Sequence, residues 1–356
     1  MSDYKIALIP GDGIGNEVVP EGVRALEAAG KRYGISFSWQ EHDWSCERYQ
    51  KLGAMMPEDG IEQVKGTDGI FLGAVGFPGV PDHVSLWGLL IPLRRELQQY
   101  VNLRPVRLLK GILSPLRDRG PEDIDFFVVR ENNEGEYSEI GGRLFAGTDA
   151  EMAMQESVFT RRGIDRILRY AFELAASRAA KHVTSATKSN GIIHSMPFWD
   201  ERVKAISSEH PDVEVNQFHI DILTAHFVLH PDWFDVVVGS NLFGDILSDL
   251  GPAIAGSIGI APSANINPQR TYPSMFEPVH GSAPDIAGQG IANPIATIWT
   301  LAMMLEHLGE SEAAQACEEA MEAVLTAGPE SRTKDLGGTA TTASCTEAVI
   351  KTLMAS

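Results

Sequence analysis

The chain has 356 residues, 44% of them hydrophobic and 22% charged, which is typical of a globular protein with a substantial core and predicts about two domains. The formal net charge of −19 argues against nucleic acid and anionic membranes as partners. The longest apolar run, residues 294–305, is shorter than the ~20 residues that a membrane-spanning helix needs.

The N-terminal residues lack the basic and apolar regions of a signal peptide and lead directly into an apolar strand at residues 5–10. A glycine-rich turn at residues 11–15 follows, and Asn16 and Glu17 open a helix that runs to about residue 29. The spacing Gly11-x-Gly13-x-Gly15 differs from the G-x-G-x-x-G fingerprint of dinucleotide-binding Rossmann domains, in which Glu41 would be the ribose acid. A plain strand–turn–helix is therefore the favoured interpretation.

The next elements alternate between strands and helices. Residues 35–41 and 68–74 have the pattern of strands, residues 86–100 that of a helix with Pro92 inside it, and residues 101–109 and 125–130 that of extended segments. Residues 134–159 are rich in Gly and Glu and have little helical periodicity. They are expected to leave the core as a hairpin arm.

The second half continues in the same way. Helices are predicted at residues 162–180, 198–208, 220–228, 292–307 and 311–327, and extended segments at 183–187, 213–219 and 234–239. Ser240 or Asn241 is expected to cap a helix that Gly251-Pro252 ends after Leu250. The alternation predicts an α/β protein with a largely parallel sheet.

Three aspartates are candidate metal ligands. Asp245 and Asp249 are four residues apart, so they share one helix face, and their repulsion needs an offset such as a hard divalent cation. Asp221 lies inside an apolar run, where a buried acid would be paired or metal-bound. A solvated acidic face and a structural salt bridge are the alternatives.

The cations suggest where an anion could bind. Eight of the 29 Lys and Arg residues fall between Arg94 and Arg130, and only five acids accompany them. Arg94, Arg104 and Arg130 can bind carboxylates through paired N–H donors, which would suit a dicarboxylate. Lys188, in a polar turn, and Tyr137 are a candidate base and proton donor, although each alone could be a surface residue.

A loop of glycines, prolines and isolated polar residues spans residues 277–288, with Asn293 just beyond it. Small residues let a backbone approach a nucleotide closely.

Together these segments resemble the β-decarboxylating dehydrogenases of the isopropylmalate and isocitrate type. The specific stretches are Asn102-Leu103-Arg104-Pro105, Val129-Arg130-Glu131-Asn132, residues 241–249 and residues 280–288. The resemblance spans nearly the whole chain. It implies a two-domain, isopropylmalate dehydrogenase-like α/β fold, with a largely parallel sheet flanked by helices and no Rossmann domain. Residues 1–99 and 253–356 would form a large cofactor-binding domain, and residues 100–252 a small dimerisation domain with the arm at about 134–159.

The resemblance also implies roles for matching residues. The three arginines would hold the substrate carboxylates, the three aspartates Mn²⁺ or Mg²⁺, and Tyr137 would protonate the enol left by decarboxylation. Lys188 would assist removal of the hydroxyl proton, and both Lys188 and Asp221 would come from the partner subunit of a homodimer with a composite active site. Cofactor contacts are implied for His280, Gly281, Ser282, Ala283, Pro284, Asp285, Ile286 and Asn293.

Positions at which this chain differs from other members of that family indicate the cofactor and the substrate. Asp285 and Ile286 stand where NADP-using relatives have a lysine and a nearby tyrosine, so NAD is expected; a K⁺ requirement is left open. Trp87 stands where isopropylmalate enzymes have a glutamate, and with Leu90 it would narrow the pocket at C3. No serine stands between Trp87 and Arg94, which disfavours isocitrate. These features are similar to the branch that acts on tartrate and D-malate.

Two alternatives stay open at this stage. One is a 3-isopropylmalate dehydrogenase, since a single methylene changes specificity by only ~1–3 kcal/mol. The other is a non-catalytic dicarboxylate-binding dimer, which would have no reason to keep Tyr137, Lys188 and three aspartates together. Three scattered cysteines, Cys46, Cys317 and Cys345, argue against a disulfide framework or a zinc site and predict a cytoplasmic protein.

Overall fold

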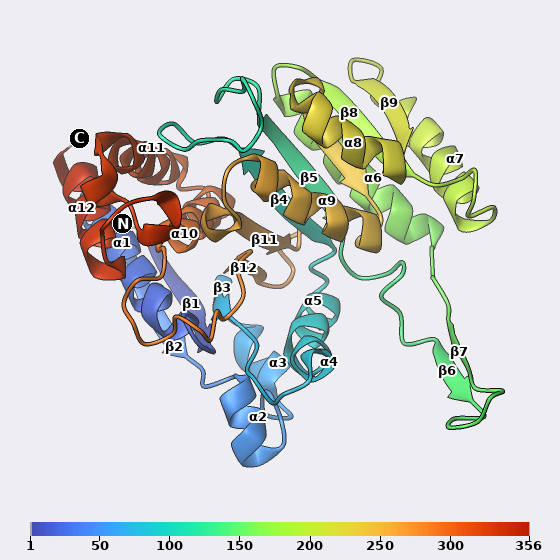
Figure 1. The fold of residues 1–356 in the computed structure, drawn as a ribbon, viewed down its shortest axis with the longest axis horizontal. Helices are drawn as coiled ribbons and strands as arrows, with labels where there is room; N and C mark the ends of the chain where they lie inside the picture. The colour runs from blue at the N-terminus through green and yellow to red at the C-terminus, as the bar shows by residue number, and fades with distance from the viewer. Residues whose placement is uncertain (1, 356) are drawn as a thin grey trace.

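One ten-stranded sheet runs through the whole molecule, which a computed structural model describes for residues 2–355 (Figure 1). The strand order is β2-β1-β3-β12-β11-β4-β5-β10-β8-β9. The sheet strands are β1 (Ser2–Gly11), β2 (Ile35–Glu41), β3 (Gly69–Ala74), β4 (Val101–Arg107), β5 (Asp125–Glu131), β8 (His182–Thr187), β9 (Glu214–His219), β10 (Val236–Gly239), β11 (Pro262–Ile266) and β12 (Ser274–Pro278).

The sheet is parallel at both ends and antiparallel in the middle. Strands β2, β1, β3 and β12 are parallel to one another, and so are β5, β10, β8 and β9. The junctions β12–β11, β11–β4 and β4–β5 are antiparallel, so the two parallel groups run in opposite directions. This arrangement confirms the predicted α/β class with a largely parallel sheet and differs from a Rossmann sheet, whose strands run parallel.

Helices cover both faces of the sheet. The helices are α1 (Gly15–Tyr33), α2 (Cys46–Leu52), α3 (Gly60–Val64), α4 (Asp82–Ser85), α5 (Ile91–Glu96), α6 (Arg161–Ser177), α7 (Ser195–Ser207), α8 (Ile220–Leu229), α9 (Asn241–Ile254), α10 (Ile295–Leu308), α11 (Ser311–Ala327) and α12 (Thr342–Ala355). Helices α6 and α9 pack on β5 and β10 from opposite sides, and α1 and α10 cover β3. The predicted division into residues 1–99 with 253–356 and residues 100–252 stays a prediction, because the sheet is continuous across it.

Hydrophobic periodicity explains these elements. Strands β3 and β10 are buried along their whole length, as expected of parallel strands covered on both faces. The predicted apolar stripe of α6, at Ile164, Leu168, Ala171, Phe172 and Ala175, is fully buried. Alternation along β4 sends Arg104 to one face of the sheet and Leu103 and Pro105 to the other. A single strand therefore contributes to two different surfaces.

Two helix predictions need correction. The segment predicted as one helix over residues 86–100 begins earlier, at Asp82, contains a π-helical turn at Leu86–Leu90 and ends at Glu96. Pro92 follows the wide turn, which relieves the clash that proline causes in a continuous α-helix. Helix α9 does not end at Leu250, since it includes Pro252 and closes with the Ala255 N–H bonded to the Gly251 carbonyl at 3.0 Å.

The cap of α9 also differs from the prediction. The Ser240 side chain does not cap the helix but donates to Glu136 at 2.7 Å. The same Glu136 carboxylate accepts from the Leu242 N–H at 3.0 Å. A residue at the root of the arm therefore satisfies a free donor of the helix N-terminus and fixes where α9 starts.

The arm is a hairpin of β6 (Gly141–Leu144) and β7 (Met152–Gln155) that projects away from the body (Figure 1). It begins where Gly135 and Val158 exchange backbone hydrogen bonds of 2.8 and 2.9 Å. Leu144, Phe145 and Met154 are all more than half exposed. The predicted excursion is confirmed, and its apolar surface has no cover within the described chain.

The glycine-rich turn joins several loops. Asp12 is buried and accepts N–H bonds from Cys46, Glu47 and Gly76 at 3.0, 3.3 and 3.1 Å. Gly13 has a φ of +55°, and a Cβ there would lie 2.1 Å from the Ser282 carbonyl oxygen. The glycines therefore serve close packing of the loops.

The three cysteines are free and buried. Burial raises the pKa of the Cys46, Cys317 and Cys345 thiols to about 12. Within residues 2–355, no helix combines the length and apolar character required to cross a membrane.

Candidate functional site

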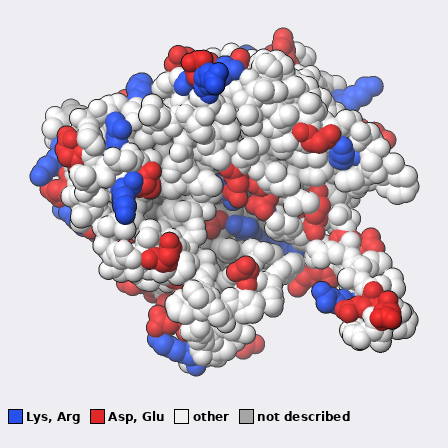
Figure 2. All heavy atoms as spheres, viewed as in Figure 1, with Lys and Arg blue, Asp and Glu red and all other residues white. Residues whose placement is uncertain are grey.

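Three buried arginines converge on one face of the sheet. Arg94 comes from α5, Arg104 from β4 and Arg130 from the end of β5, and each is less than a tenth exposed. Burial lowers the pKa of Arg130 to about 10; the Asp245 charge raises this pKa, and the charges of Arg104 and Arg94 lower it further. The guanidinium therefore stays charged at neutral pH. Figure 2 shows a hollow in this face with basic side chains inside and acidic ones at its rim.

Each arginine has a carboxylate partner. Arg94 lies 2.9 Å from Glu277, Arg104 lies 3.0 Å from Asp249, and Arg130 pairs with Asp245. The Nε groups of Arg94 and Arg104 are buried and have no hydrogen-bond partner among residues 2–355. Unsatisfied buried donors are costly, so an anion that accepts from them would be stabilised here.

A cavity of about 180 Å³ lies against Arg94 and Arg104. Its lining includes Leu90, Arg94, Arg104, Ser263, Glu277 and His280. Trp87 does not line this cavity; its ring lies beneath the Arg95 guanidinium at 5.0 Å. The structure thus places Leu90 in the wall of the arginine cavity, as predicted. It places Trp87 outside that wall, against Arg95.

Tyr137 and the acids of α9 adjoin the arginines. The Tyr137 hydroxyl donates to Asp245 at 2.6 Å, and its ring lies 5.4 Å from the Arg130 guanidinium. Burial and the Asp245 carboxylate raise the pKa of Tyr137 to about 12, which keeps its proton in place at neutral pH. Burial pushes the pKa of Asp245 upward, but Arg130 and the Tyr137 hydroxyl outweigh that effect, so its pKa lies below the ordinary value.

Asp245 and Asp249 share one face of α9, as predicted, and arginines offset their repulsion. Asp221 was expected to be buried, but its side chain is 67% exposed and pairs with Lys188 at 2.6 Å. The hydrogen bond from Lys188 lowers the pKa of Asp221. Its apolar neighbours do not enclose Asp221, because it lies in the first turn of α8, on the surface of the single chain.

The carboxylates fit a divalent cation only in part. No group of three or more His, Cys, Asp or Glu side chains able to hold a metal ion occurs within residues 2–355. One chain offers the oxygens of Asp245 and Asp249, the donor type that Mg²⁺ and Mn²⁺ favour. Asp221 does not join them in the single chain, where it is exposed and pairs with Lys188.

A larger cavity of about 480 Å³ lies beside the predicted cofactor loop. It is lined by Ile14, Gly259, His280, Ala283, Ile286, Ile291, Asn293, Lys334 and Asp335. His280 also lines the arginine cavity, so the two spaces meet at this residue. Burial lowers the pKa of His280, and its Nε2 atom has no hydrogen-bond partner. A neutral ring with a free nitrogen suits contact with a bound cofactor.

The cofactor loop is held from several sides. The Ile14 N–H donates to the Ser282 carbonyl at 2.8 Å, and the Glu17 carboxylate accepts from the Gly290 N–H at 2.8 Å. Gly281, Pro284 and Asp285 remain exposed. Asn293 donates to Asp335 at 2.9 Å instead of standing free, and that bond fixes its orientation in the cavity wall.

Several residues of these cavities were missed from the sequence. Glu277 pairs with Arg94 across 183 positions, and Lys334 and Asp335 come from a segment far beyond the loop, so local patterns cannot reveal them. Ile14 and Glu17 belong to the glycine-rich segment, whose link to the loop could have been suspected from its many small residues.

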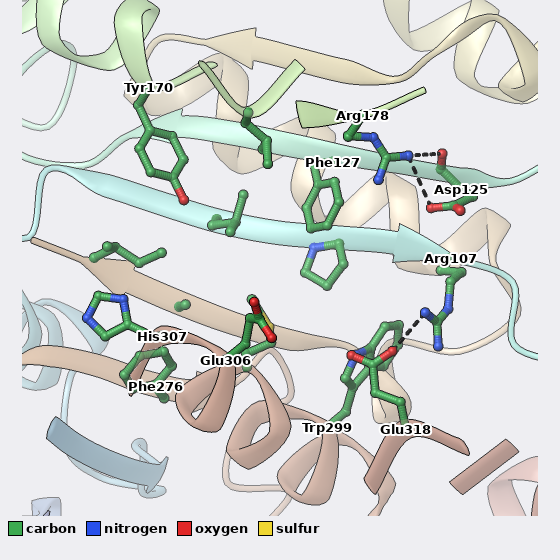
Figure 3. Close-up of a pocket in the computed structure, with 16 residues that line it drawn as sticks. Arg107, Asp125, Phe127, Tyr170, Arg178, Phe276, Trp299, Glu306, His307 and Glu318 are labelled. Atoms are coloured by element: carbon green, nitrogen blue, oxygen red, sulfur yellow. Dashed lines mark hydrogen bonds and ion pairs between the residues drawn. The ribbon is translucent and has the colours of Figure 1, made fainter. Parts of the chain in front are cut away.

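A further cavity, of about 370 Å³, lies on the opposite face of the sheet (Figure 3). Leu103, Pro105, Phe127 and Trp299 give it apolar walls. Its arginines are already paired, Arg107 with Glu318 at 2.8 Å and Arg178 with Asp125 at 3.4 Å. None of the residues predicted for the site lines this space.

Known proteins resemble this chain over its whole length. The profile described as isocitrate/isopropylmalate dehydrogenase matches residues 5–351. The D-malate dehydrogenase (decarboxylating) of Escherichia coli K12 is 59% identical, covering 99% of both chains. The tartrate dehydrogenase/decarboxylase of Pseudomonas putida is 57% identical, covering 98% of both.

The fold agrees with that similarity. The crystal structure of isocitrate dehydrogenase from Methylococcus capsulatus matches with a TM-score of 0.88 at 35% identity, covering 99% of both chains. The family resemblance drawn from the sequence is therefore confirmed, and so is its isopropylmalate dehydrogenase-like fold. The chain belongs to the isocitrate/isopropylmalate dehydrogenase family.

Proposed function

We propose that this protein is an NAD-dependent and divalent-metal-dependent dehydrogenase of small 2-hydroxy dicarboxylates, which converts D-malate to pyruvate and carbon dioxide and tartrate to its keto acid. The observation that carries the proposal is the small cavity lined by Arg94 and Arg104, together with the contacts that link the buried arginines to the α9 acids and Asp245 to Tyr137. The relatives named for D-malate and tartrate support the same substrates.

The arginines would bind and orient the substrate. Two carboxylates need several N–H donors, and the unpartnered Nε groups of Arg94 and Arg104 are available for them. Leu90 would stand near C3 and limit the size of its substituent. A hydrogen or a hydroxyl group at C3 suits a cavity of about 180 Å³ better than the isopropyl group of the alternative substrate.

Tyr137 would act as the proton donor. Its raised pKa of about 12 keeps the hydroxyl protonated, and its bond to Asp245 fixes the direction of that proton. After the substrate loses carbon dioxide, Tyr137 would protonate C3 of the enol. Lys188, now paired with Asp221, would take the C2 hydroxyl proton in the site of a partner subunit.

Asp245 and Asp249, with the partner's Asp221, would hold Mn²⁺ or Mg²⁺, and the loop from His280 to Ile286 with Asn293 would hold NAD. When bound, NAD accepts the hydride from C2, and the divalent cation draws electrons from the C2 oxygen so that its proton leaves more easily. Asp285 would accept hydrogen bonds from the adenosine ribose and repel a 2′-phosphate.

A homodimer follows from the same proposal. Helices α8 and α9 pack together and expose the apolar side chains of Ile222, Val228, Leu229, Leu242 and Ile246. The arm adds further uncovered apolar residues. Such a surface is typical of an interface, and a second copy of the chain would also bring Lys188 and Asp221 to the site. A cytoplasmic location is also proposed, in keeping with three free, buried cysteines.

The test is initial NADH formation with NAD and Mn²⁺ against D-malate, (+)-tartrate, meso-tartrate, 3-isopropylmalate and isocitrate. D-malate and tartrate should give the highest rates, and omission of Mn²⁺ or replacement of NAD by NADP should lower them. A lead of ten-fold or more for isopropylmalate, about 1.4 kcal/mol, would overturn the substrate assignment. Binding of D-malate with no NADH from any substrate would favour the non-catalytic dimer.

A further inference from the structure

Arg95 touches two segments that carry predicted site residues. Its Nη2 donates to the Tyr137 carbonyl at 2.8 Å, and its Nη1 lies 3.1 Å from Glu139. Its guanidinium lies over the Trp87 ring at 5.0 Å. The side chain is 29% exposed, so these contacts are partly shielded from water.

The two segments are far apart in the sequence and carry different predicted site residues. Trp87 belongs to the π-helical turn Leu86–Leu90. Leu90, the last residue of this turn, lines the cavity directly. Tyr137 precedes the exposed arm and carries the hydroxyl bonded to Asp245. Arg95 is adjacent to Arg94, whose side chain enters the cavity. The Arg95 guanidinium therefore connects the π-helical turn, whose Leu90 would stand near C3 of the substrate, to the backbone of Tyr137, the proposed proton donor.

We propose that Arg95 is a positioning and specificity-determining residue, which holds Trp87 and Tyr137 together so that the cavity closes tightly around a substrate with a small group at C3. The inference deepens the proposed function and rests on it for the substrate. Trp87 thus acts on substrate size through Arg95 and not through direct lining of the cavity.

Arginine suits this position for a chemical reason. A planar guanidinium can present its face to an aromatic ring while its edge donates to a carbonyl and a carboxylate. A lysine ammonium keeps the charge but offers neither the flat face nor the paired donors. Arg95→Lys should therefore behave like Arg95→Met in selectivity, although it preserves the local charge.

The first experiment compares kcat/KM for D-malate and for 3-isopropylmalate in the wild type, Arg95→Met and Arg95→Lys. Arg24→Met is the matched control, because Arg24 likewise uses both Nη groups, here to pair with Glu21 and Glu347 on the surface helices α1 and α12. The selectivity for D-malate should fall about ten-fold in both Arg95 variants, the scale of a lost hydrogen bond to a charged group, and stay unchanged in Arg24→Met.

A second measurement does not depend on activity. Backbone hydrogen exchange should become several-fold faster at residues 86–90 and 137–139 in Arg95→Met, since the tie between them is lost, and should remain unchanged there in Arg24→Met. Trp87→Leu should lower the selectivity by itself, and adding Arg95→Met should change it little further, because the two residues act as one unit.

The outcomes separate the two levels of the proposal. If the wild type oxidises neither substrate, the proposed function fails, and the exchange data still decide whether Arg95 ties the segments. If exchange is unchanged in Arg95→Met, no tie exists. If exchange rises while both substrates lose kcat/KM equally, Arg95 is structural only and the specificity role is refuted.

Discussion

At the scale of single residues, the site balances buried charges. Arg94, Arg104 and Arg130 would be costly to bury alone, and each is matched by a carboxylate. The Nε groups of Arg94 and Arg104 have no partner among residues 2–355, whereas that of Arg130 donates to Asn241 at 3.1 Å. Removing Glu277 would leave Arg94 buried without its partner. The carboxylates therefore offset the cost of burying the arginines, and the proposed substrate would use the remaining donors.

Replacing Tyr137 with phenylalanine removes the proposed proton donor and keeps its ring over Arg130. We expect kcat for D-malate to fall about 10²- to 10⁴-fold, the range of general acid catalysis, with little change in melting temperature. Tyr170→Phe is the control, because the Tyr170 ring faces the opposite cavity (Figure 3). Equal rates for Tyr137→Phe and the wild type would exclude the assigned role.

Asp285 can be tested through cofactor preference. Asp285→Asn removes the negative charge from an exposed loop position, so repulsion of a 2′-phosphate should weaken. The ratio of kcat/KM for NAD to that for NADP should fall about ten-fold, while Asp212→Asn, on a distant exposed aspartate paired with Lys181, should leave it unchanged. An unaltered ratio in Asp285→Asn would mean that other groups select the cofactor.

At the scale of elements, helix α9 is the organising piece of the site. It carries Asp245 and Asp249, its N-terminus is capped by Glu136 from the arm root, and it packs on β4 and β5. Gly244 and Gly251 allow close approach to the sheet: a Cβ at Gly244 would lie 2.5 Å from the Arg130 Cβ, and one at Gly251 would lie 2.3 Å from the Val106 Cγ2. The position of the proposed metal-binding face relative to the arginines therefore depends on the absence of these side chains.

Gly244→Ala should push α9 away from β5 and displace Arg130 from Asp245. We expect a loss of about 1–3 kcal/mol in the free energy of unfolding, as for other overpacked sites, and a drop of at least about ten-fold in kcat/KM for D-malate. Urea denaturation and steady-state kinetics measure the two effects. Gly66→Ala, where a Cβ would meet open space, should change neither; wild-type kinetics in Gly244→Ala would contradict this account.

At the scale of the whole molecule, a single chain leaves two of the predicted site residues apart from the others and leaves apolar side chains exposed. Lys188 and Asp221 bind each other at the surface, apart from the other site residues, and apolar side chains on α8, α9 and the arm remain uncovered. The proposed dimer would bury these side chains and complete two sites at once. Stability and activity would then share a dependence on protein concentration.

Ile246 lies on the exposed face of α9 and is 46% exposed in the single chain. Ile246→Lys would place a charge in the proposed interface, so we expect monomers in light-scattering chromatography and a loss of activity that parallels dissociation. Leu52→Lys, on the surface of α2, is the control for the added charge. A dimeric Ile246→Lys protein would place the interface elsewhere.

His307 makes the fold sensitive to acid. Burial, followed by the charge of Arg270, lowers the pKa of His307 to about 4, below its ordinary value of 6.5. As pH falls from 6.5 towards 4, the unfolded chain takes up a proton that the folded chain excludes, so the free energy of unfolding decreases. This part of the stability is present above pH 6.5.

His307→Gln should therefore flatten the fall in stability between pH 6.5 and 4, measured by urea denaturation across that range. His194→Gln, at an exposed position, should leave the slope unchanged. Identical slopes in the wild type and His307→Gln would show that other groups govern the acid sensitivity.

Much of this architecture could be read from the sequence, but not all of it. Apolar runs and alternation located most strands and helices, and the arm was recognised because it lacks a helical period. Strands β11 and β12 were missed. In β11 the small polar residues Ser263 and Asn265 alternate with Ala264 and Ile266, so no apolar run marks a strand that is nonetheless buried.

The same limit applies to the site. The arginines, Tyr137 and the α9 acids could be named from sequence, and the structure brings them together. Glu277 could not, because its role depends on a contact with Arg94 that only the folded sheet creates. Asp221 was expected to be buried because of its apolar neighbours, yet those neighbours belong to a surface that another chain would cover.

The burial of the three cysteines has a practical consequence. Thiol-specific dyes and spin labels react with thiolates, and Cys46, Cys317 and Cys345 are enclosed and remain protonated at neutral pH. A cysteine introduced at the exposed Asp149, in the arm between β6 and β7, would then be labelled with little background. Because the native thiols would contribute little signal, fluorescence or electron resonance could then measure the distance between the two arms of the proposed dimer in solution.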